Sequence, residues 1–373
     1  MSSLKFPPLL EALDLTSTTA FSASLTLLLI ICPVAYLSSR WLRSWLSSSR
    51  SLTTMTNVRV SKILVHPIKS CRGISVQSSR YTREGLESDR KWCVIAADDN
   101  KVITAREVPK MVLITPKIED VDLASPYSGV LTVSFPDDSG CPPFSIPLSP
   151  DQAILNTWKR IEKVFLWDSI LDAYICEALP APPSQSPSEI LSSYFGRPVH
   201  LVYKGPQPRP VDPTPTHPKL NTTAVFQDGY PLLVLSQEST ARIEEELRGH
   251  VGKQGIDERW RTDTLVIERF RPNVVFEGAG PFAEDAWEEI RIGSLPDAPL
   301  ISLVSKCTRC LLPNISPETG VMDKAVPYKT LIKFRRVDPG APMKACVGTN
   351  GCPQGEGLIR VGDSIAARTR LDN

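Results

Sequence analysis

Short apolar runs, many of them alternating with polar residues, recur along the chain between turns rich in proline, glycine, asparagine and aspartate. An alternation with a period of two residues predicts a strand with one buried face. A turn at residues 98–100 returns the chain after one such run. We therefore expect strands at residues 57–65, 91–97, 111–118, 130–135, 199–203, 274–276, 289–292, 299–305, 358–361 and 364–367, and an apolar run at 231–235.

Two stretches predict helices instead. Ser186 precedes Pro187, which suits the first turn of a helix, and this helix should end near residue 195. Ser236 is expected to cap a second, charged helix that ends near Gly249. Few helices among many strands, in a chain with 34 prolines, indicate an α+β (mixed α/β) fold dominated by mixed and antiparallel strands.

A proline-rich stretch divides the strand-rich part of the chain. Residues 205–218 hold six prolines and can form neither a helix nor a central strand. We read this stretch as a domain boundary or a semi-rigid loop beside a site. The predicted domains are a β-rich domain at residues 57–200, a linker at 201–219 and a second, barrel-like domain at 220–370.

The amino-terminal segment has a different pattern. No charged residue lies between Asp14 and Arg40, and the apolar run at residues 20–37 is about the shortest helix that spans a bilayer. Trp41 and Trp45 follow, where an aromatic belt would sit, and the positive charge lies after the run. A cleaved secretory peptide carries its charge before the apolar core, so an uncleaved signal anchor is favoured. We expect a tail at 1–19, a membrane span at 20–37 and a juxtamembrane linker at 38–56.

Charge and cysteine content restrict the possible functions. Lysine and arginine total 42 against 41 acidic residues, which gives no electrostatic basis for binding nucleic acid. The nine cysteines are odd in number and irregularly spaced, unlike a secreted disulfide framework. Reduced thiols facing the cytosol fit this pattern better.

The segment 306–310 carries two of these thiols. Cys307 and Cys310 flank Arg309, and a neighbouring guanidinium favours the thiolate, which is the metal-binding form of cysteine. One alternative is that both are small buried residues of a strand. Another is a structural zinc site that adds Cys346 and Cys352, although the second pair is widely spaced.

Polar loops elsewhere could supply a binding site for an anion. Lys69 and Ser70 lie in a loop after the first predicted strand, with donors suited to a phosphate. Arg271 and Asn273 lie at a proline-stiffened corner before residues 274–276. Arg90 follows an aspartate directly and could instead belong to an ion pair. Each loop alone is also an ordinary solvated turn.

The motifs in order resemble those of the MOSC-domain proteins, and within them the mitochondrial amidoxime-reducing components. They read PIKSCRGI, GLESDRKW, ITAREVPKMVLI, FRPN, AEDAWEEIRIG, KCTRCLLPNISPETG and IRVGDSI, and the resemblance covers about residues 57–368. It implies a molybdenum cofactor, molybdenum held by a phosphorylated pterin dithiolene, with Cys310 as the protein's metal ligand and catalytic residue. By motif position the cofactor-binding residues are Lys69, Ser70, Arg90, Asp228, Gly229, Arg271, Asn273, Thr308, Arg309 and Cys310.

The sequence departs from the family pattern at two places. Relatives commonly have hydroxyl residues after the aspartate where this chain has Gly229, which offers only its backbone. Residues 346–355 carry cysteines where relatives tend to have an aromatic-glycine segment. The second departure bears on the substrate entrance rather than on the metal.

The resemblance also implies an activity and partners. These are reduction of N-hydroxylated compounds such as amidoximes and hydroxamic acids, with nitrite as a further candidate. Electrons would come from NADH through NADH–cytochrome b5 reductase and cytochrome b5. The expected location is the mitochondrial outer membrane, single-pass, with the catalytic part facing the cytosol. The alternative within the family is a sulfur carrier or cofactor-handling module, although this chain lacks the pyridoxal-dependent half of a cofactor sulfurase.

Overall fold

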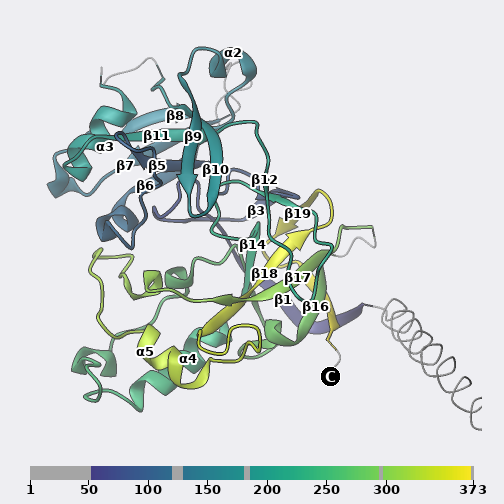
Figure 1. Cartoon of the computed structure of the whole chain (residues 1–373). Coiled ribbons are helices and arrows are strands. Elements are labelled where there is room, and N and C mark those ends of the chain that lie inside the picture. The colour runs from purple at the N-terminus through teal and green to yellow at the C-terminus, as the bar shows by residue number, and fades with distance from the viewer. Residues whose placement is uncertain (1–51, 120–128, 180–184, 294–296, 371–373) are drawn as a thin grey trace, which may run out of the picture. The chain divides into compact units, whose positions relative to one another are not determined.

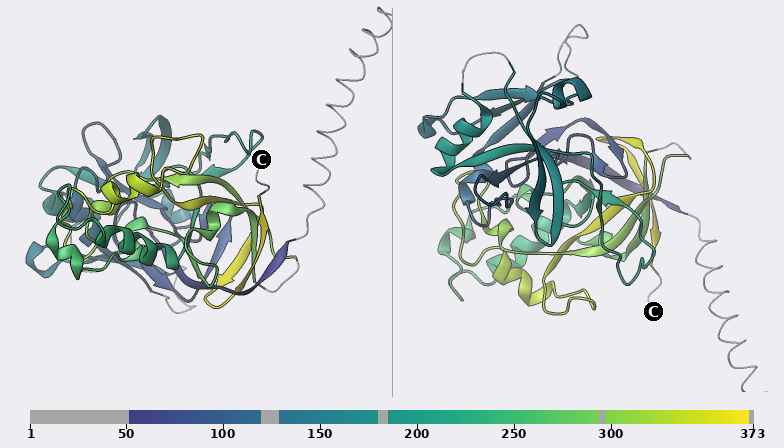
Figure 2. Two further views of the ribbon diagram at one scale, coloured as in Figure 1. Left: turned by 90° about the horizontal axis from the view of Figure 1, so that it is seen from below. Right: turned by 45° about the horizontal axis from the view of Figure 1, so that its top comes forward.

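The structure is a computed structural model that describes residues 52–119, 129–179, 185–293 and 297–370 (Figures 1 and 2). The predicted membrane span at 20–37 lies outside these residues. In the part of the chain that is described, no helix is long and apolar enough to cross a bilayer.

A closed ring is formed by six strands from the C-terminal half of the chain together with β1 from its beginning. The order β15-β14-β18-β17-β16-β20-β1 closes because β1 also pairs with β15, which gives seven strands, and β2 adds to β1 from outside. Within the ring β14 and β15 are parallel, and closure leaves no ring strand with an unpaired edge. Its strands are β1 (Thr53–Val65), β14 (Leu232–Ser236), β15 (Val274–Glu277), β16 (Trp287–Ile292), β17 (Ile301–Thr308), β18 (Cys346–Pro353) and β20 (Ser364–Thr369), with β2 at Ile74–Val76.

Alternate residues of these strands fill the barrel. The apolar positions that drive strand formation point inward, and they include Val60, Ile63, Phe276, Ile290 and Leu303, all almost completely buried. Burying one such side chain contributes roughly 1.5–3 kcal/mol. The ring is therefore a rigid frame for the loops at its ends.

The N-terminal half packs its strands around a second core. A four-stranded sheet has the order β5-β11-β10-β9, and β6, β7 and β8 form a three-stranded sheet beside it. Trp92, Met111, Leu131 and Ile146 lie between them. The strands are β5 (Trp92–Ala96), β6 (Thr115–Glu119), β7 (Val130–Ser134), β8 (Phe144–Pro147), β9 (Arg160–Leu166), β10 (Ser169–Ile175) and β11 (Val199–Lys204).

Shorter elements complete the chain. The small sheets are β19-β3-β4 and β12-β13, formed by β3 (Ser78–Thr82), β4 (Gly85–Leu86), β12 (Arg209–Pro210), β13 (Thr223–Ala224) and β19 (Gly357–Arg360). The α-helices described are α2 (Gln152–Leu155), α3 (Pro187–Phe195), α4 (Glu238–Arg248) and α5 (Tyr328–Phe334). Single 3₁₀ turns are η1 (Pro109–Leu113), η2 (Asp137–Ser139), η3 (Glu258–Arg261), η4 (Ile267–Phe270), η5 (Ala283–Ala286) and η6 (Leu312–Asn314).

Most predicted elements are confirmed, and the differences have physical causes. Ser186 caps α3 through a complete capping box with Glu189. The strand predicted at 111–118 is wrong in its first half, because residues 109–113 form η1. The cap predicted at Ser236 is also wrong. Its hydroxyl oxygen lies 2.7 Å from both the Gly280 carbonyl and a Glu238 carboxylate oxygen, which share its one proton, and α4 begins after Gln237 without a side-chain cap.

Candidate cofactor site

A cavity of about 270 Å³ lies where several loops meet the end of β17. Its lining comes from the loop after β1, the segment before β5, the segment before β14 with one position of β14, the turn before β15, the end of β17 with the chain after it, and one position of β18. Nine of the ten residues predicted to bind a cofactor line this single cavity: Lys69, Ser70, Arg90, Asp228, Gly229, Arg271, Thr308, Arg309 and Cys310. Residues that are far apart in the chain therefore converge.

The thiol of Cys310 is exposed in this cavity. It lies just beyond β17, where the chain leaves the barrel, and the backbone N–H of Leu312 donates to its Sγ at 3.5 Å. A donor directed at the sulfur stabilises negative charge on it. The sulfur is thus accessible to a ligand in the cavity.

Arg309 is held against the neighbouring thiol. Only 8% of its surface is exposed, and it donates to the Phe270 carbonyl at 2.8 Å and to the Sγ of Cys307 at 3.0 Å. The guanidinium also lies 5.4 Å from the Phe270 ring centroid. These contacts fix a positive charge beside the Cys307 sulfur.

Asp89 orients Arg90 toward the cavity. The Asp89 carboxylate is fully buried and accepts from Arg90 at 2.6 Å and from the His66 backbone N–H at 2.7 Å. Burial alone would raise the pKa of Asp89, but the Arg90 charge and the contact with His66 outweigh burial and lower it. Arg90 donates in addition to the Arg271 carbonyl at 3.2 Å. Arg90 therefore forms the predicted ion pair with Asp89 and also lines the cavity.

Arg271 keeps an unused donor. Its Nη1 donates to the Cys71 carbonyl at 2.6 Å, while Nη2 is buried and has no hydrogen-bond partner among the described residues. Burial, together with the nearby Arg90 charge, lowers the pKa of Arg271 to about 10, so it stays charged at neutral pH. A buried unpaired donor is costly, and an anionic ligand would satisfy it.

Lys69 is a further basic residue that lines the cavity. Its Nζ donates to the Phe226 carbonyl at 2.8 Å and to Asp228 at 2.5 Å. Lys69 is buried, whereas 74% of the Asp228 side chain is exposed. Burial lowers the pKa of Lys69, and the Asp228 charge opposes this effect.

Three of the lining residues have left-handed backbone. The φ angles of Ser70, Arg90 and Arg271 are 68°, 50° and 55°. Such angles are uncommon outside glycine, and they concentrate where function requires a particular side-chain direction. All three are among the residues predicted from the sequence to bind the anionic cofactor.

Comparison with known proteins places the chain in a family. Residues 57–179 match the MOSC N-terminal beta barrel domain, and residues 221–366 match the MOSC domain. This chain is a member of the MOSC-domain family.

Named MOSC relatives cover most of the chain. The human protein named mitochondrial amidoxime-reducing component 1 is 27% identical over 340 residues, 87% of each chain. The mouse protein of that name is 28% identical over 82% of this chain and 81% of its own, and human component 2 is 27% identical over 90% of each chain. Among solved structures, YiiM from Geobacillus stearothermophilus aligns over 44% of this chain and 71% of its own, with 15% identity and a TM-score of 0.25.

Asn273 is the one predicted site residue of this MOSC chain that does not line the cavity. Its side chain accepts from the Leu233 N–H at 3.1 Å and donates to the Leu64 carbonyl at 3.2 Å. It is nearly fully buried, and both of its polar ends are occupied by backbone of β1 and β14. The structure therefore gives Asn273 a positioning role, two residues after Arg271.

Several lining residues escaped prediction from the sequence. They are Gln227, Tyr230, Leu233, Phe270, Cys307, Leu312 and Asn350. Cys307 lay inside a segment already singled out, and so did Asn350, although its residue type alone gave no signal. Asn350 belongs to the segment expected to shape the substrate entrance, and that segment is the barrel strand β18.

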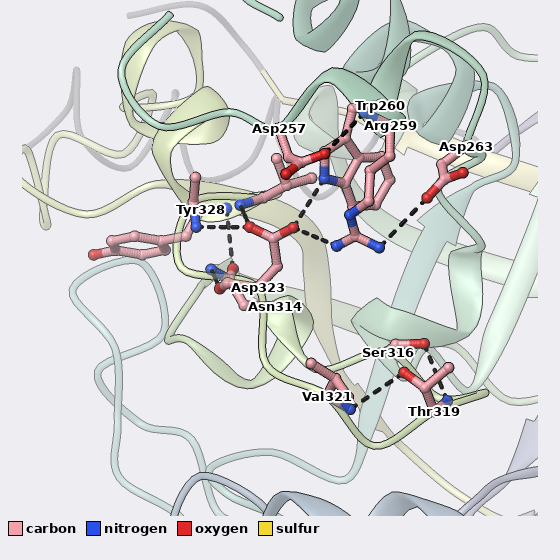
Figure 3. A network of polar contacts seen from close by, with 12 residues as sticks. Asp257, Arg259, Trp260, Asp263, Asn314, Ser316, Thr319, Val321, Asp323 and Tyr328 are labelled. Atoms are coloured by element: carbon pink, nitrogen blue, oxygen red, sulfur yellow. Dashed lines mark hydrogen bonds and ion pairs between the residues drawn. The ribbon is translucent and has the colours of Figure 1, made fainter. Parts of the chain in front are cut away.

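A polar network holds the MOSC loop that follows Cys310 (Figure 3). Asp323 accepts from Arg259 at 2.6 Å, from the indole N–H of Trp260 at 2.9 Å and from two backbone N–H groups. Asn314 joins the same network, donating to the Asp323 carbonyl at 2.8 Å and accepting from the Tyr328 N–H at 3.1 Å. Because the loop is fixed at Asn314, its first residues hold the Cys310 sulfur in place.

The four-cysteine zinc site is excluded. Cys346 and Cys352 are both buried and lie at opposite ends of β18, so they are roughly 20 Å apart at 3.3 Å per residue. Cys346 pairs across the sheet with Thr308, and Cys352 pairs with Ser302. Among the described residues, no cluster of three or more potential ligands could hold a metal ion. A cofactor that brings its own ligands and needs one thiol fits this donor set better than a bare ion.

Proposed function

We propose that this MOSC protein is a molybdenum-cofactor oxidoreductase that reduces N-hydroxylated compounds such as amidoximes and hydroxamic acids. The observation that carries the proposal is the exposed Cys310 thiol in a cavity shared with Lys69, Arg90 and Arg271. The names of its relatives support the same activity. A thiol surrounded by basic groups from separate loops suits a cofactor that is both metallic and phosphorylated.

The residues of the cavity fit such a group. Cys310 would be the metal ligand, while Lys69, Ser70, Arg90 and Arg271 would hold the anionic pterin and its phosphate. The unused Nη2 donor of Arg271 is the clearest sign that an acceptor belongs in the cavity. When bound, the cofactor supplies the two-electron removal of oxygen from the substrate, releasing it as water.

The chain's own groups set the conditions for this chemistry. The Leu312 N–H donates to the Cys310 sulfur, and the Arg309 guanidinium donates to the sulfur of the neighbouring Cys307. Asp228 is the one carboxylate among the described residues that line the cavity, and Lys69 neutralises it. The cavity therefore has a net positive charge that attracts an anionic cofactor.

The proposal extends to partners and location. Electrons come from NADH through NADH–cytochrome b5 reductase and cytochrome b5, and the protein is anchored in the mitochondrial outer membrane by residues 20–37. The relatives' names describe mitochondrial components, which supports this location. The apolar composition of residues 20–37 supports the anchor.

The test uses the full chain in detergent, with reduced methyl viologen as electron donor and benzamidoxime as substrate. We expect one molybdenum and one pterin per chain, and conversion to benzamidine. Cys310→Ala should abolish turnover without changing the unfolding temperature. Cys141→Ala, which removes a partly buried thiol that does not line the cavity, is the matched control and should stay active. A fully active Cys310→Ala variant would refute the proposal. Cofactor transfer without turnover would instead indicate a carrier.

A further inference from the structure

Arg106 stacks on an exposed tryptophan beside the cavity. Trp167 occupies the two-residue turn between β9 and β10, where Leu166 pairs with Ser169. The Arg106 guanidinium lies 4.4 Å from the Trp167 ring centroid, and 49% of the Trp167 surface is exposed. Cation–π stacking of this kind fixes the plane of a guanidinium group.

The backbone at Trp167 is strained. Its φ angle is 52°, and the positive angles of two-residue hairpin turns are normally taken by glycine or asparagine. A bulky residue with this conformation is a genuine outlier. Since half of the ring remains exposed, burial does little to offset the cost. The turn requires a positive φ here but not a tryptophan, so the choice of this side chain points to a role for the ring.

The donors of Arg106 face solvent. Arg106 is exposed, and across the described parts of the chain it stacks on Trp167 without making a hydrogen bond or ion pair with another residue. Stacking occupies the face of a guanidinium and leaves its N–H edges free. An arginine held flat with open edges is prepared to receive an oxyanion in a bidentate manner.

Neither residue of the pair lines the cofactor cavity, but Trp167 lies next to a residue that does. The Nζ of Lys69, which lines the cavity, lies 5.9 Å from the Trp167 ring centroid. The charges of Lys69, Arg106 and Arg90 lower the pKa of the Asp228 carboxyl, so Arg106 acts electrostatically on a cavity residue. Figure 1 shows the β9–β10 hairpin reaching from the N-terminal strands toward β14.

We propose that Arg106, held on Trp167, recognises a carboxylate carried by the substrate at a distance from its N-hydroxyl group. This inference rests on the proposed function and names a substrate class within it, the acidic N-hydroxylated compounds. Asp228 does not oppose such a ligand, because Lys69 already pairs with it at 2.5 Å. The motif ITAREVPK, which the predicted site left unused, thereby acquires a role through its arginine.

The decisive experiment compares benzamidoxime with its 4-carboxy derivative. In the wild-type protein KM should be lower for the carboxylated compound. Arg106→Gln should raise that KM by about tenfold, leaving both kcat values and the KM for benzamidoxime unchanged. Trp167→Ala should give part of the same loss, because Arg106 remains but is no longer held. Arg336→Gln is the control, since Arg336 is an exposed arginine away from the described cavities.

Other results of the same experiment would show whether the role of Arg106 or the proposed function is wrong. If Arg106→Gln raises both KM values equally, or changes neither, the inference is wrong. If it lowers the pterin content per chain, the anion that Arg106 binds is the cofactor's phosphate. If the wild-type protein reduces neither compound, the proposed function fails, and binding of the non-reducible 4-carboxybenzamidine by calorimetry then decides the inference alone. Weaker binding by Arg106→Gln would support it, and absence of binding to the wild-type protein would overturn it.

Discussion

A buried carboxyl group in η5 makes the stability of this protein depend on pH. Glu284 is fully buried, and neither of its carboxyl oxygens has a hydrogen-bond partner among the described residues. Burial, reinforced by the neighbouring Asp285 charge, raises the pKa of Glu284 to about 8 from an ordinary value of 4.5. The folded protein therefore holds this proton across the neutral range, while the unfolded chain releases it.

The sign follows from proton linkage. Between pH 4.5 and about 8 the unfolded state binds fewer protons at Glu284 than the folded state does, so stability falls as pH rises and levels off above this range. A pH of 7 lies about 2.5 units above the ordinary pKa of 4.5. At 1.36 kcal/mol per unit, this difference amounts to roughly 3 kcal/mol of lost stability. Glu284→Gln keeps the size and neutral state of the side chain and removes the ionisation. The free energy of unfolding of the variant relative to that of the wild type should therefore increase by about this amount between pH 5 and pH 7.

Urea unfolding at pH 5, 6, 7 and 8, followed by tryptophan fluorescence, measures this directly. The free energy of unfolding of Glu284→Gln should vary less with pH than that of the wild type, with the largest difference at pH 8. Glu356→Gln, at an exposed position, is the matched control and should follow the wild-type curve. A constant difference between Glu284→Gln and wild type at all four pH values would refute the reasoning, because it would reflect packing rather than ionisation.

Three further predictions concern the residues that support the cavity. Asp89→Asn should destabilise the fold by about 3 kcal/mol in urea unfolding and lower the bound molybdenum, because it leaves Arg90 without its buried partner. Asn273→Ala should cost about 1–3 kcal/mol by the same assay, since two buried backbone groups lose their partners, and unchanged stability would contradict the positioning role. Asp323→Asn should loosen the loop behind Cys310, which metal analysis would detect as reduced molybdenum content with a smaller loss of stability.

The strands were largely predictable because one face of each is buried, and burial imposes a period of two on the sequence. The segment 109–113 broke this rule because Met111 and Val112 are buried within a 3₁₀ turn, where a run of apolar residues looks the same as a strand. Ser236 misled because a serine before a helix is usually a cap, whereas here a tertiary contact with Gly280 takes its hydroxyl.

The candidate site was predictable where residue type reveals chemistry, as for Cys310, Lys69 and Arg271. The site was not predictable where backbone geometry decides which side chain enters the cavity. Nothing in the sequence distinguishes Asn273, whose amide joins two strands, from Arg271 two residues earlier, whose guanidinium lines the cavity. The left-handed backbone of Arg90 is equally invisible, because tertiary contacts and not residue type impose it.

The strand order of the barrel has a consequence for biosynthesis. The ring needs β1 to hydrogen-bond with both β15 and β20, so its first strand waits for partners more than 200 residues further along the polypeptide. Because a ribosome delivers those partners last, the barrel can close only after synthesis of Thr369. Until then the apolar face of β1 is available to chaperones, and the cofactor cavity that the barrel frames does not yet exist.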